Sequence, residues 1–263
     1  MIRKISRKSC HLRSGPSART SAYVMRGVTL FVLGLLALGG PVSAQTSAAG
    51  AGMNKVSRED IEWLDVWLPD TNDNNLPRVL LIGDSITRGY YPEVEKAFAG
   101  RAYVGRLTTS KSLGDPALLK EVALVLSQQH YQVIHFNNGL HGSGYSEAVY
   151  AQALPSVMAV FRRHAPGTRV IWASTTDMLP SFEGDHPTLP RIIERNRLAA
   201  LWAAKNGIPV DDLFPIAARH PEYHTQDGVH FAPGGYAALA AKVSSLISQV
   251  LAAASGAEPS VSP

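Results

Sequence analysis

The clearest pattern in the chain is a short apolar run that ends in small or polar residues and recurs several times. The first is Val79–Ile82, which is followed by Gly83, Asp84 and Ser85. An apolar run of this length, bounded by turn-forming residues, is typical of a buried strand. The pattern predicts five strands, over residues 79–83, 102–107, 132–138, 168–174 and 208–210.

Segments with helical signals lie between these strands. Asp115 and Pro116 supply an N-cap and a proline at the first helical position, and Gly207 stands where a helix commonly ends. Ser57, with acidic residues after it and Pro69 at its end, predicts an N-terminal helix over residues 57–68. The other predicted helices cover 92–99, 115–129, a segment that ends at 164, 189–206 and 236–251. Strands that alternate with helices indicate a mostly parallel sheet with helices on both faces.

The first 44 residues have the features of an export signal. Seven basic and no acidic residues precede an apolar stretch within 27–40, and Val42-Ser43-Ala44 matches the small-x-small cleavage pattern. The apolar stretch is shorter than the roughly 20 residues that a membrane span needs, so we expect cleavage rather than an anchor. The chain then divides into a signal peptide (1–44), a linker and N-terminal helix (45–76), one folded domain (77–253) and a disordered tail (254–263).

The signal accounts for the basic character of the whole chain. The chain has 25 basic and 21 acidic residues, but the part after residue 44 has 18 and 21, a net charge of −3. A nucleic-acid partner would need a basic surface, so we expect none, and we expect no stable membrane insertion after signal removal. Cys10, the only cysteine, also lies in the signal. These features predict a periplasmic or secreted protein without disulfides; its oligomeric state stays open.

Ser85 is a candidate nucleophile because it follows a buried strand directly. Ligands of open α/β sheets bind at the carboxyl ends of the strands, where this hydroxyl would lie. A serine hydroxyl needs a general base and a third group that orients the base. Asp227 and His230, three residues apart in a turn before the last helix, can supply both. The carboxylate would hold one ring nitrogen while the other faces the serine.

Four motifs in this order resemble the SGNH (GDSL-type) hydrolases. They are Gly83-Asp84-Ser85, the glycine of Ser112–Asp115, the strand that ends in the loop Asn138–His141, and Asp227-x-x-His230. The resemblance extends from about residue 78 to residue 251. It implies a flavodoxin-like three-layer α/β/α sandwich with a mostly parallel five-stranded sheet, and ester hydrolysis through an acyl-enzyme. We expect no cofactor and no metal ion.

The resemblance also implies a role for each motif. Ser85 would be the nucleophile, His230 the general base and then the general acid, and Asp227 the orienting carboxylate. The oxyanion hole would comprise the backbone N–H groups of Ser85 and Gly114 and one side-chain donor. The family's Gly-x-Asn-Asp motif is replaced here by Gly-Leu-His-Gly, so either His141 or Asn138 would be that donor.

Two other interpretations compete with this one. The residues His220, His224, Asp227 and His230 fall within eleven positions and include the ligand types of a catalytic zinc site, but Pro221 interrupts the segment. Alternatively, an SGNH-like fold could bind a polysaccharide without cleaving it. We expect His135, inside an apolar strand, to be a core residue without a catalytic role.

The substrate is the least specified part of the prediction. We expect Tyr90, Tyr91, Tyr145 and Tyr223 to be exposed, and sugars stack on exposed aromatic faces. A carbohydrate O-acetylesterase is therefore the predicted function, with a small-molecule or polysaccharide ester as its substrate. Lipase or thioesterase activity is the alternative.

Overall fold

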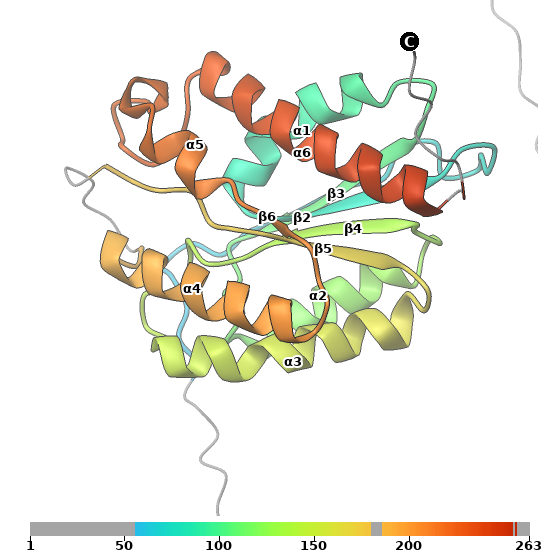
Figure 1. The fold of residues 1–263 in the computed structure, drawn as a ribbon. Helices are drawn as coiled ribbons and strands as arrows, with labels where there is room; N and C mark the ends of the chain where they lie inside the picture. The colour runs from blue at the N-terminus through green and yellow to red at the C-terminus, as the bar shows by residue number, and fades with distance from the viewer. Residues whose placement is uncertain (1–55, 180–185, 255, 257–263) are drawn as a thin grey trace, which may run out of the picture. The chain divides into compact units, whose positions relative to one another are not determined.

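A six-stranded sheet is the centre of the computed structural model, which describes residues 56–179, 186–254 and 256 (Figure 1). The strand order is β1-β3-β2-β4-β5-β6; β1 runs antiparallel to β3, and the other neighbours are parallel. The strands are β1 (Leu64–Trp67), β2 (Arg78–Gly83), β3 (Tyr103–Thr109), β4 (Val133–Asn137), β5 (Arg169–Ala173) and β6 (Val210–Asp211).

Helices cover both faces of the sheet. In Figure 1, α1, α5 and α6 lie on one face, and α2, α3 and α4 lie on the other. Their bounds are α1 (Ser85–Ala97), α2 (Pro116–Leu126), α3 (Glu147–His164), α4 (Leu189–Lys205), α5 (Phe214–Ala218) and α6 (Pro233–Ala254), with a short 3₁₀ helix, η1 (Pro221–Tyr223). This arrangement confirms the predicted three-layer fold with a mostly parallel sheet.

The strand β2 is buried on both faces. Its side chains alternate between two cores, because successive residues of a strand point to opposite faces. Val79 and Leu81 pack in the core on the α1 and α6 face, and Leu80 and Ile82 in the core on the other face. All four are at most 1% exposed. Burial of each such side chain contributes about 1.5–3 kcal/mol, which explains why this strand reads as a continuous apolar run.

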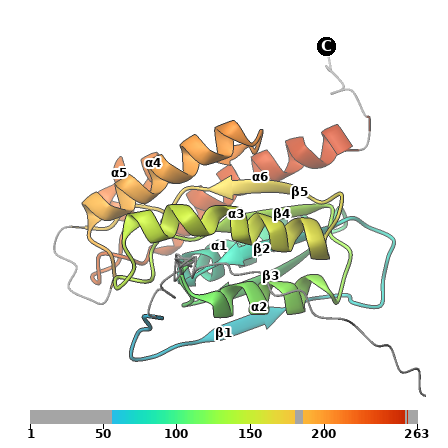
Figure 2. The same ribbon diagram turned by 90° about the horizontal axis from the view of Figure 1, so that it is seen from below.

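The predicted N-terminal helix over residues 57–68 is wrong. The segment is extended and ends in β1, which adds a sixth strand to the five that we predicted. Its apolar positions suggested a helical face, but Ile61 is 77% exposed and Trp67 54% exposed. The backbone groups of this segment pair with the open edge of β3, with Leu64 opposite Thr109 (Figure 2). Edge pairing therefore outweighs the local helical preference.

The first helix after β2 begins earlier than predicted. We expected helix from about residue 92, whereas α1 starts at Ser85 and passes through Pro92. Gly89 and Pro92 look like helix breakers in the sequence. Gly89 is required by packing instead, because a Cβ there would lie 2.2 Å from the ring of Tyr236 on α6.

Several predictions concern residues that the structure does not describe. The signal peptide (1–44), most of the linker and the tail from 254, apart from Ala254 and Gly256, lie outside the described residues. Among the residues that are described, α6 is long and apolar enough to cross a membrane by length and composition. Its buried residues Leu239, Val243 and Ile247 belong to the core on the α1 face, which indicates a core helix.

Replacing Gly89 by alanine should destabilise the fold. Alanine gains up to about 1 kcal/mol over glycine inside a helix, but overpacking costs about 1–3 kcal/mol, so we expect a net loss of about 1–2 kcal/mol. Urea unfolding measures this change. The control is Gly234→Ala, also in a helix, where a Cβ meets no atom within 4 Å. Equal stability of the Gly89→Ala protein and the wild type would contradict the packing argument.

Candidate active site

The carboxyl ends of the parallel strands meet at one edge of the sheet, and Ser85 lies there. Asp84 is the single residue between β2 and α1, and its Oδ1 accepts a hydrogen bond of 2.9 Å from the backbone N–H of Ile86. Asp84 is thus the N-cap of α1, and Ser85 is the first residue of that helix. The N-terminal end of a helix carries partial positive charge, which favours a negative charge that develops beside Ser85.

Asp227 and His230 lie in the turn between η1 and α6. The turn is closed by Asp227 Oδ1, which accepts hydrogen bonds from the backbone N–H groups of Val229 (3.0 Å) and His230 (2.9 Å). Gly228 adopts a φ of 74°, which a glycine adopts without strain. This local network holds both functional side chains on the same side of the turn.

Three side chains form a continuous line of hydrogen bonds. His230 Nδ1 lies 2.7 Å from Asp227 Oδ2, and His230 Nε2 lies 2.9 Å from Ser85 Oγ. A carboxylate only accepts hydrogen bonds, so Nδ1 carries the proton and Nε2 can accept the serine proton. The arrangement can therefore activate the serine hydroxyl.

The charge of Asp227 supports this assignment. Partial burial opposes ionisation, but the hydrogen bonds from the Val229 backbone and from His230 outweigh it and hold the pKa of Asp227 well below its usual range. Asp227 is consequently a carboxylate across the working pH range, able to orient the ring and to stabilise it when it becomes charged.

Gly114 and Asn138 lie in neighbouring loops at the same edge. The side chain of Asn138 is buried and binds the loop after β3, accepting from the backbone N–H of Leu113 (2.8 Å) and donating to the carbonyl of Lys111 (2.9 Å). Gly114 follows in that loop, and its backbone N–H lies 3.5 Å from Ser112 Oγ. Asn138 thus positions the loop that carries Gly114.

His141 lies in the loop after β4 and is 6% exposed. Its Nδ1 is 2.8 Å and 3.0 Å from the two carboxylate oxygens of Glu59. Its Nε2 is buried and has no hydrogen-bond partner among the described residues. Trp63 and His186 pack against the ring edge-on, with centroids 6.1 Å and 5.0 Å away. His141 thus has one bound nitrogen and one buried nitrogen that no described residue binds.

The backbone of this loop is held by Arg195 on α4, which is completely buried. Its guanidinium donates to the carbonyls of Gly139, His141, Gly142 and Tyr145, at 2.8–3.0 Å. Four bonds to one planar group fix the path of the loop around His141.

The whole chain was also compared with known proteins. The family model described as GDSL-like Lipase/Acylhydrolase matches residues 81–238, which include Ser85, His141, Asp227 and His230. The chain belongs to this family. The resemblance to SGNH hydrolases is therefore confirmed, and the protein is a serine ester hydrolase. A search of curated protein sequences finds no match.

Solved structures with the same fold are distant in sequence. A carbohydrate esterase family 3 protein from Talaromyces cellulolyticus is 16% identical with a TM-score of 0.54, over 67% of this chain and 99% of that one. The lipase/acylhydrolase from Enterococcus faecalis is 20% identical with a TM-score of 0.54, over 66% and 96%. The aryl esterase from M. smegmatis is 14% identical with a TM-score of 0.54, over 66% and 99%. These similarities show the fold.

The histidines before α6 do not form one cluster in this GDSL-family chain. His220 binds Glu222 (2.9 Å), and His224 lies 3.3 Å from Asp177, so neither joins Asp227 and His230. Among the described residues, Glu59, His141 and His186 each bring one ligand atom within 4.8 Å of the others and could approach a metal ion. The 2.8 Å separation of Glu59 and His141 is that of a direct hydrogen bond, however, so an ion would have to displace the proton.

The exposed tyrosines that we predicted are mostly buried. Tyr90, Tyr91 and Tyr145 are 1–3% exposed and pack in the interior, whereas Tyr223 is half-buried. Tyr90 and Tyr91 pack in the core on the α1 face, and Tyr145 lies beside Gly114. These three buried rings therefore offer no stacking surface to a sugar. His135 is a buried core residue as predicted, 3.0 Å from Asp211.

Sequence reasoning missed Glu59 and Arg195. Glu59 lies in the segment that we took for a helix, 82 positions from His141. Arg195 occupies a helix where an arginine is expected to be exposed. The only sequence signal was indirect: a polar loop of several glycines, 139–144, needs hydrogen-bond partners from elsewhere.

Ser85→Ala and His230→Ala should each lower kcat by about 10⁴–10⁶-fold, and the double variant should be hardly slower, because the two groups act as a unit. Hydrolysis of p-nitrophenyl acetate measures the loss. His220→Ala, an exposed histidine in a neighbouring turn, is the control and should retain wild-type activity. Multiplicative losses in the double variant, or loss of wild-type activity with EDTA and its return with zinc, would contradict this assignment.

Proposed function

We propose that the protein removes a short acyl group, in particular an O-acetyl group, from a carbohydrate through an acyl-enzyme on Ser85. The observation that carries the proposal is the line of hydrogen bonds from Ser85 through His230 to Asp227, at 2.9 Å and 2.7 Å.

The chemistry follows from these positions. Ser85 Oγ attacks the ester carbonyl as His230 Nε2 takes the hydroxyl proton, and the C–O bond to the alcohol breaks as His230 returns that proton to the leaving oxygen. Water then attacks the acyl-enzyme, again through His230, and releases the carboxylic acid and Ser85. Asp227 stabilises the imidazolium in both halves. The N–H groups of Ser85 and Gly114, with His141, would bind the oxyanion.

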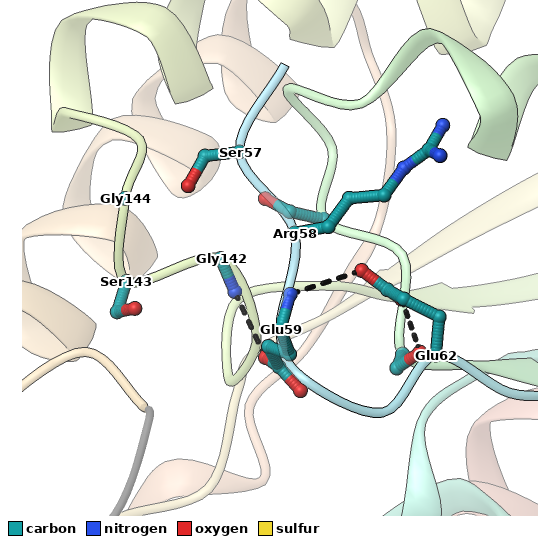
Figure 3. Close-up of a pocket in the computed structure, with 9 residues that line it drawn as sticks. Ser57, Arg58, Glu59, Glu62, Gly142, Ser143 and Gly144 are labelled. Atoms are coloured by element: carbon teal, nitrogen blue, oxygen red, sulfur yellow. Dashed lines mark hydrogen bonds between the residues drawn. The ribbon is translucent and has the colours of Figure 1, made fainter.

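Two cavities that described residues line at this edge of the sheet are small. One of about 90 Å³ lies between the segment 57–62 and the loops at 110–112 and 142–144 (Figure 3). Its lining includes the carboxylates of Glu59 and Glu62, which do not suit an acyl chain. A second, of about 10 Å³, lies among the strand ends near Asp84 and Thr175. Pockets that enclose drug-sized ligands measure about 300–1,000 Å³.

Polar groups near Ser85 suit a sugar. Arg88, one turn further along α1, is exposed, and its guanidinium lies 5.0 Å from the centre of the half-buried Trp63 ring. Together they offer hydrogen-bond donors and an aromatic surface beside the nucleophile. A lipase or thioesterase would need a longer apolar groove for its acyl chain. A protein that only binds a polysaccharide would not need the hydrogen bond between Ser85 and His230.

Acyl length should have a strong effect on rate. With p-nitrophenyl esters, we expect kcat/KM for acetate to exceed that for octanoate at least about 100-fold, because a site that lacks room for each added methylene loses 1–3 kcal/mol. Release of acetate from acetylated xylan should depend on Ser85. A higher rate with octanoate than with acetate would favour the lipase alternative, and binding of xylan by active protein without acetate release would favour another ester.

Export is part of the proposal. It is supported by the seven basic residues, the apolar stretch and the Val42-Ser43-Ala44 site. When the full chain is expressed in a bacterium, we expect the protein outside the cytoplasm, with Gln45 as its first residue. N-terminal sequencing tests this, and Ala44→Asp, which removes the small residue before the cut, should leave the precursor uncleaved. A cytoplasmic protein that retains residues 1–44 would contradict export.

A further inference from the structure

The contact between Glu59 and His141 sets which hydrogens the imidazole can offer. The carboxylate oxygens of Glu59 can only accept, and both lie within 3.0 Å of His141 Nδ1, so Nδ1 carries a proton. A neutral imidazole has one N–H, and this contact occupies it. His141 Nε2 would then bear a lone pair, which repels an oxyanion. It becomes a donor only when the ring carries both protons and a positive charge.

We propose that Glu59 is a positioning residue that holds His141 as an imidazolium, whose Nε2–H is then the side-chain donor of the oxyanion hole. This inference rests on the proposed function, because it assumes acyl transfer at Ser85. In this arrangement, the family's usual neutral amide donor is replaced by a charged imidazolium, and the carboxylate of Glu59 stabilises that charge.

The charges around His141 fit this state. Burial opposes the charged ring, but the hydrogen bond that Nδ1–H donates to Glu59 and the charges of Asp84, Glu59 and Glu62 outweigh it and raise the pKa of His141. His186 packs edge-on against the ring, and Arg195 donates to the His141 carbonyl rather than to the ring. Asp84, one of the charges that act on His141, directly precedes Ser85.

Contacts of the residues next to Glu59 in the sequence hold its segment in place. The backbone N–H of Ser57 donates to the Tyr145 hydroxyl (2.9 Å), and Arg58 pairs with Asp115 (2.9 Å). Glu62 pairs with Lys111 at 2.6 Å and accepts from the Glu59 backbone N–H. Figure 3 shows Glu59 directed towards the loop at Gly142, whose backbone N–H also donates to it. The segment 57–62 is thereby fastened to both loops of the oxyanion region.

Glu59 lies outside the residues that the family model matches. The matched residues begin at 81, so the segment 57–62 lies outside them, whereas His141 lies inside. The sequence thus departs from the family's motif at His141, and the structure supplies that histidine with a partner from outside the matched domain.

The charged state of His141 predicts that kcat/KM decreases at high pH. The rate falls as His141 loses its proton, because Nε2 then stops donating. Without the Glu59 carboxylate the pKa of His141 falls, so the descending side moves to lower pH.

The experiment is a double-mutant cycle at Glu59 and His141, measured with p-nitrophenyl acetate. Glu59→Gln should lower kcat about 10–100-fold with little change in KM, since loss of one oxyanion donor costs about 10²–10³-fold. In the His141→Asn background, whose amide needs no partner to donate, Glu59→Gln should change kcat less than about twofold, because its effect acts through His141. Asp60→Asn is the matched control: it removes an exposed carboxylate from the same segment without removing the His141 partner, and kcat should stay within about threefold of wild type.

A second measurement does not depend on activity. The ¹⁵N NMR signals of His141 should show both ring nitrogens protonated in the wild type at neutral pH, and one in Glu59→Gln. Unchanged unfolding midpoints would separate this effect from loss of folding.

Several outcomes would overturn the inference. The first is an unchanged pH dependence of kcat/KM in Glu59→Gln, and the second is an equal loss of kcat on Glu59→Gln in the wild-type and His141→Asn backgrounds. The third is a His141 ring that is neutral at pH 7. The fourth is activation of the EDTA-treated wild type by zinc, which would make Glu59 and His141 a metal site. Ser85→Ala separates the two proposals: if it stays active, the proposed function fails, whereas an inactive Ser85→Ala together with a fully active Glu59→Gln contradicts the role of Glu59 alone.

Discussion

The parallel pairing of β2 between β3 and β4 is the constraint on which the site depends. Parallel strands with matched register end at one edge, so the loops that follow β2, β3 and β4 must emerge side by side. The three loops carry Ser85, Gly114 and His141. No local signal in any one loop brings the others near; the buried apolar strands do so. The chemistry is therefore a consequence of how the sheet is packed.

The sequence predicted the parts of this structure that depend on neighbouring residues. The central strands were recognisable because each is a short run buried on both faces, and Asp227 and His230 because they share one turn. The antiparallel β1 was not recognisable. Its apolar residues are exposed, and its backbone pairs with a strand about 40 residues away, so only the tertiary structure decides between helix and strand.

The buried contacts around the site could not be predicted from the sequence, for a related reason. A single sequence contains no information on which charged residue finds a partner far along the chain. Arg195 is buried because four carbonyls, 50–56 residues away, accept its hydrogens. Tyr90 and Tyr145 are aromatic, as residues that stack on sugars are, but their side chains lie in the interior. Residue type indicates what a side chain can do, and the fold decides whether it meets a substrate, a core or another charge.

The antiparallel strand β1 has a consequence for how the protein can be handled. It covers the edge of β3, and open edges promote pairing between molecules. A fragment that begins at Arg78, the first residue of β2, would keep Ser85, Asp227 and His230, yet it would expose a row of unpaired backbone groups on β3. Such a fragment should self-associate through that edge, so the natural boundary of the folded unit lies well before the boundary of the recognisable family domain.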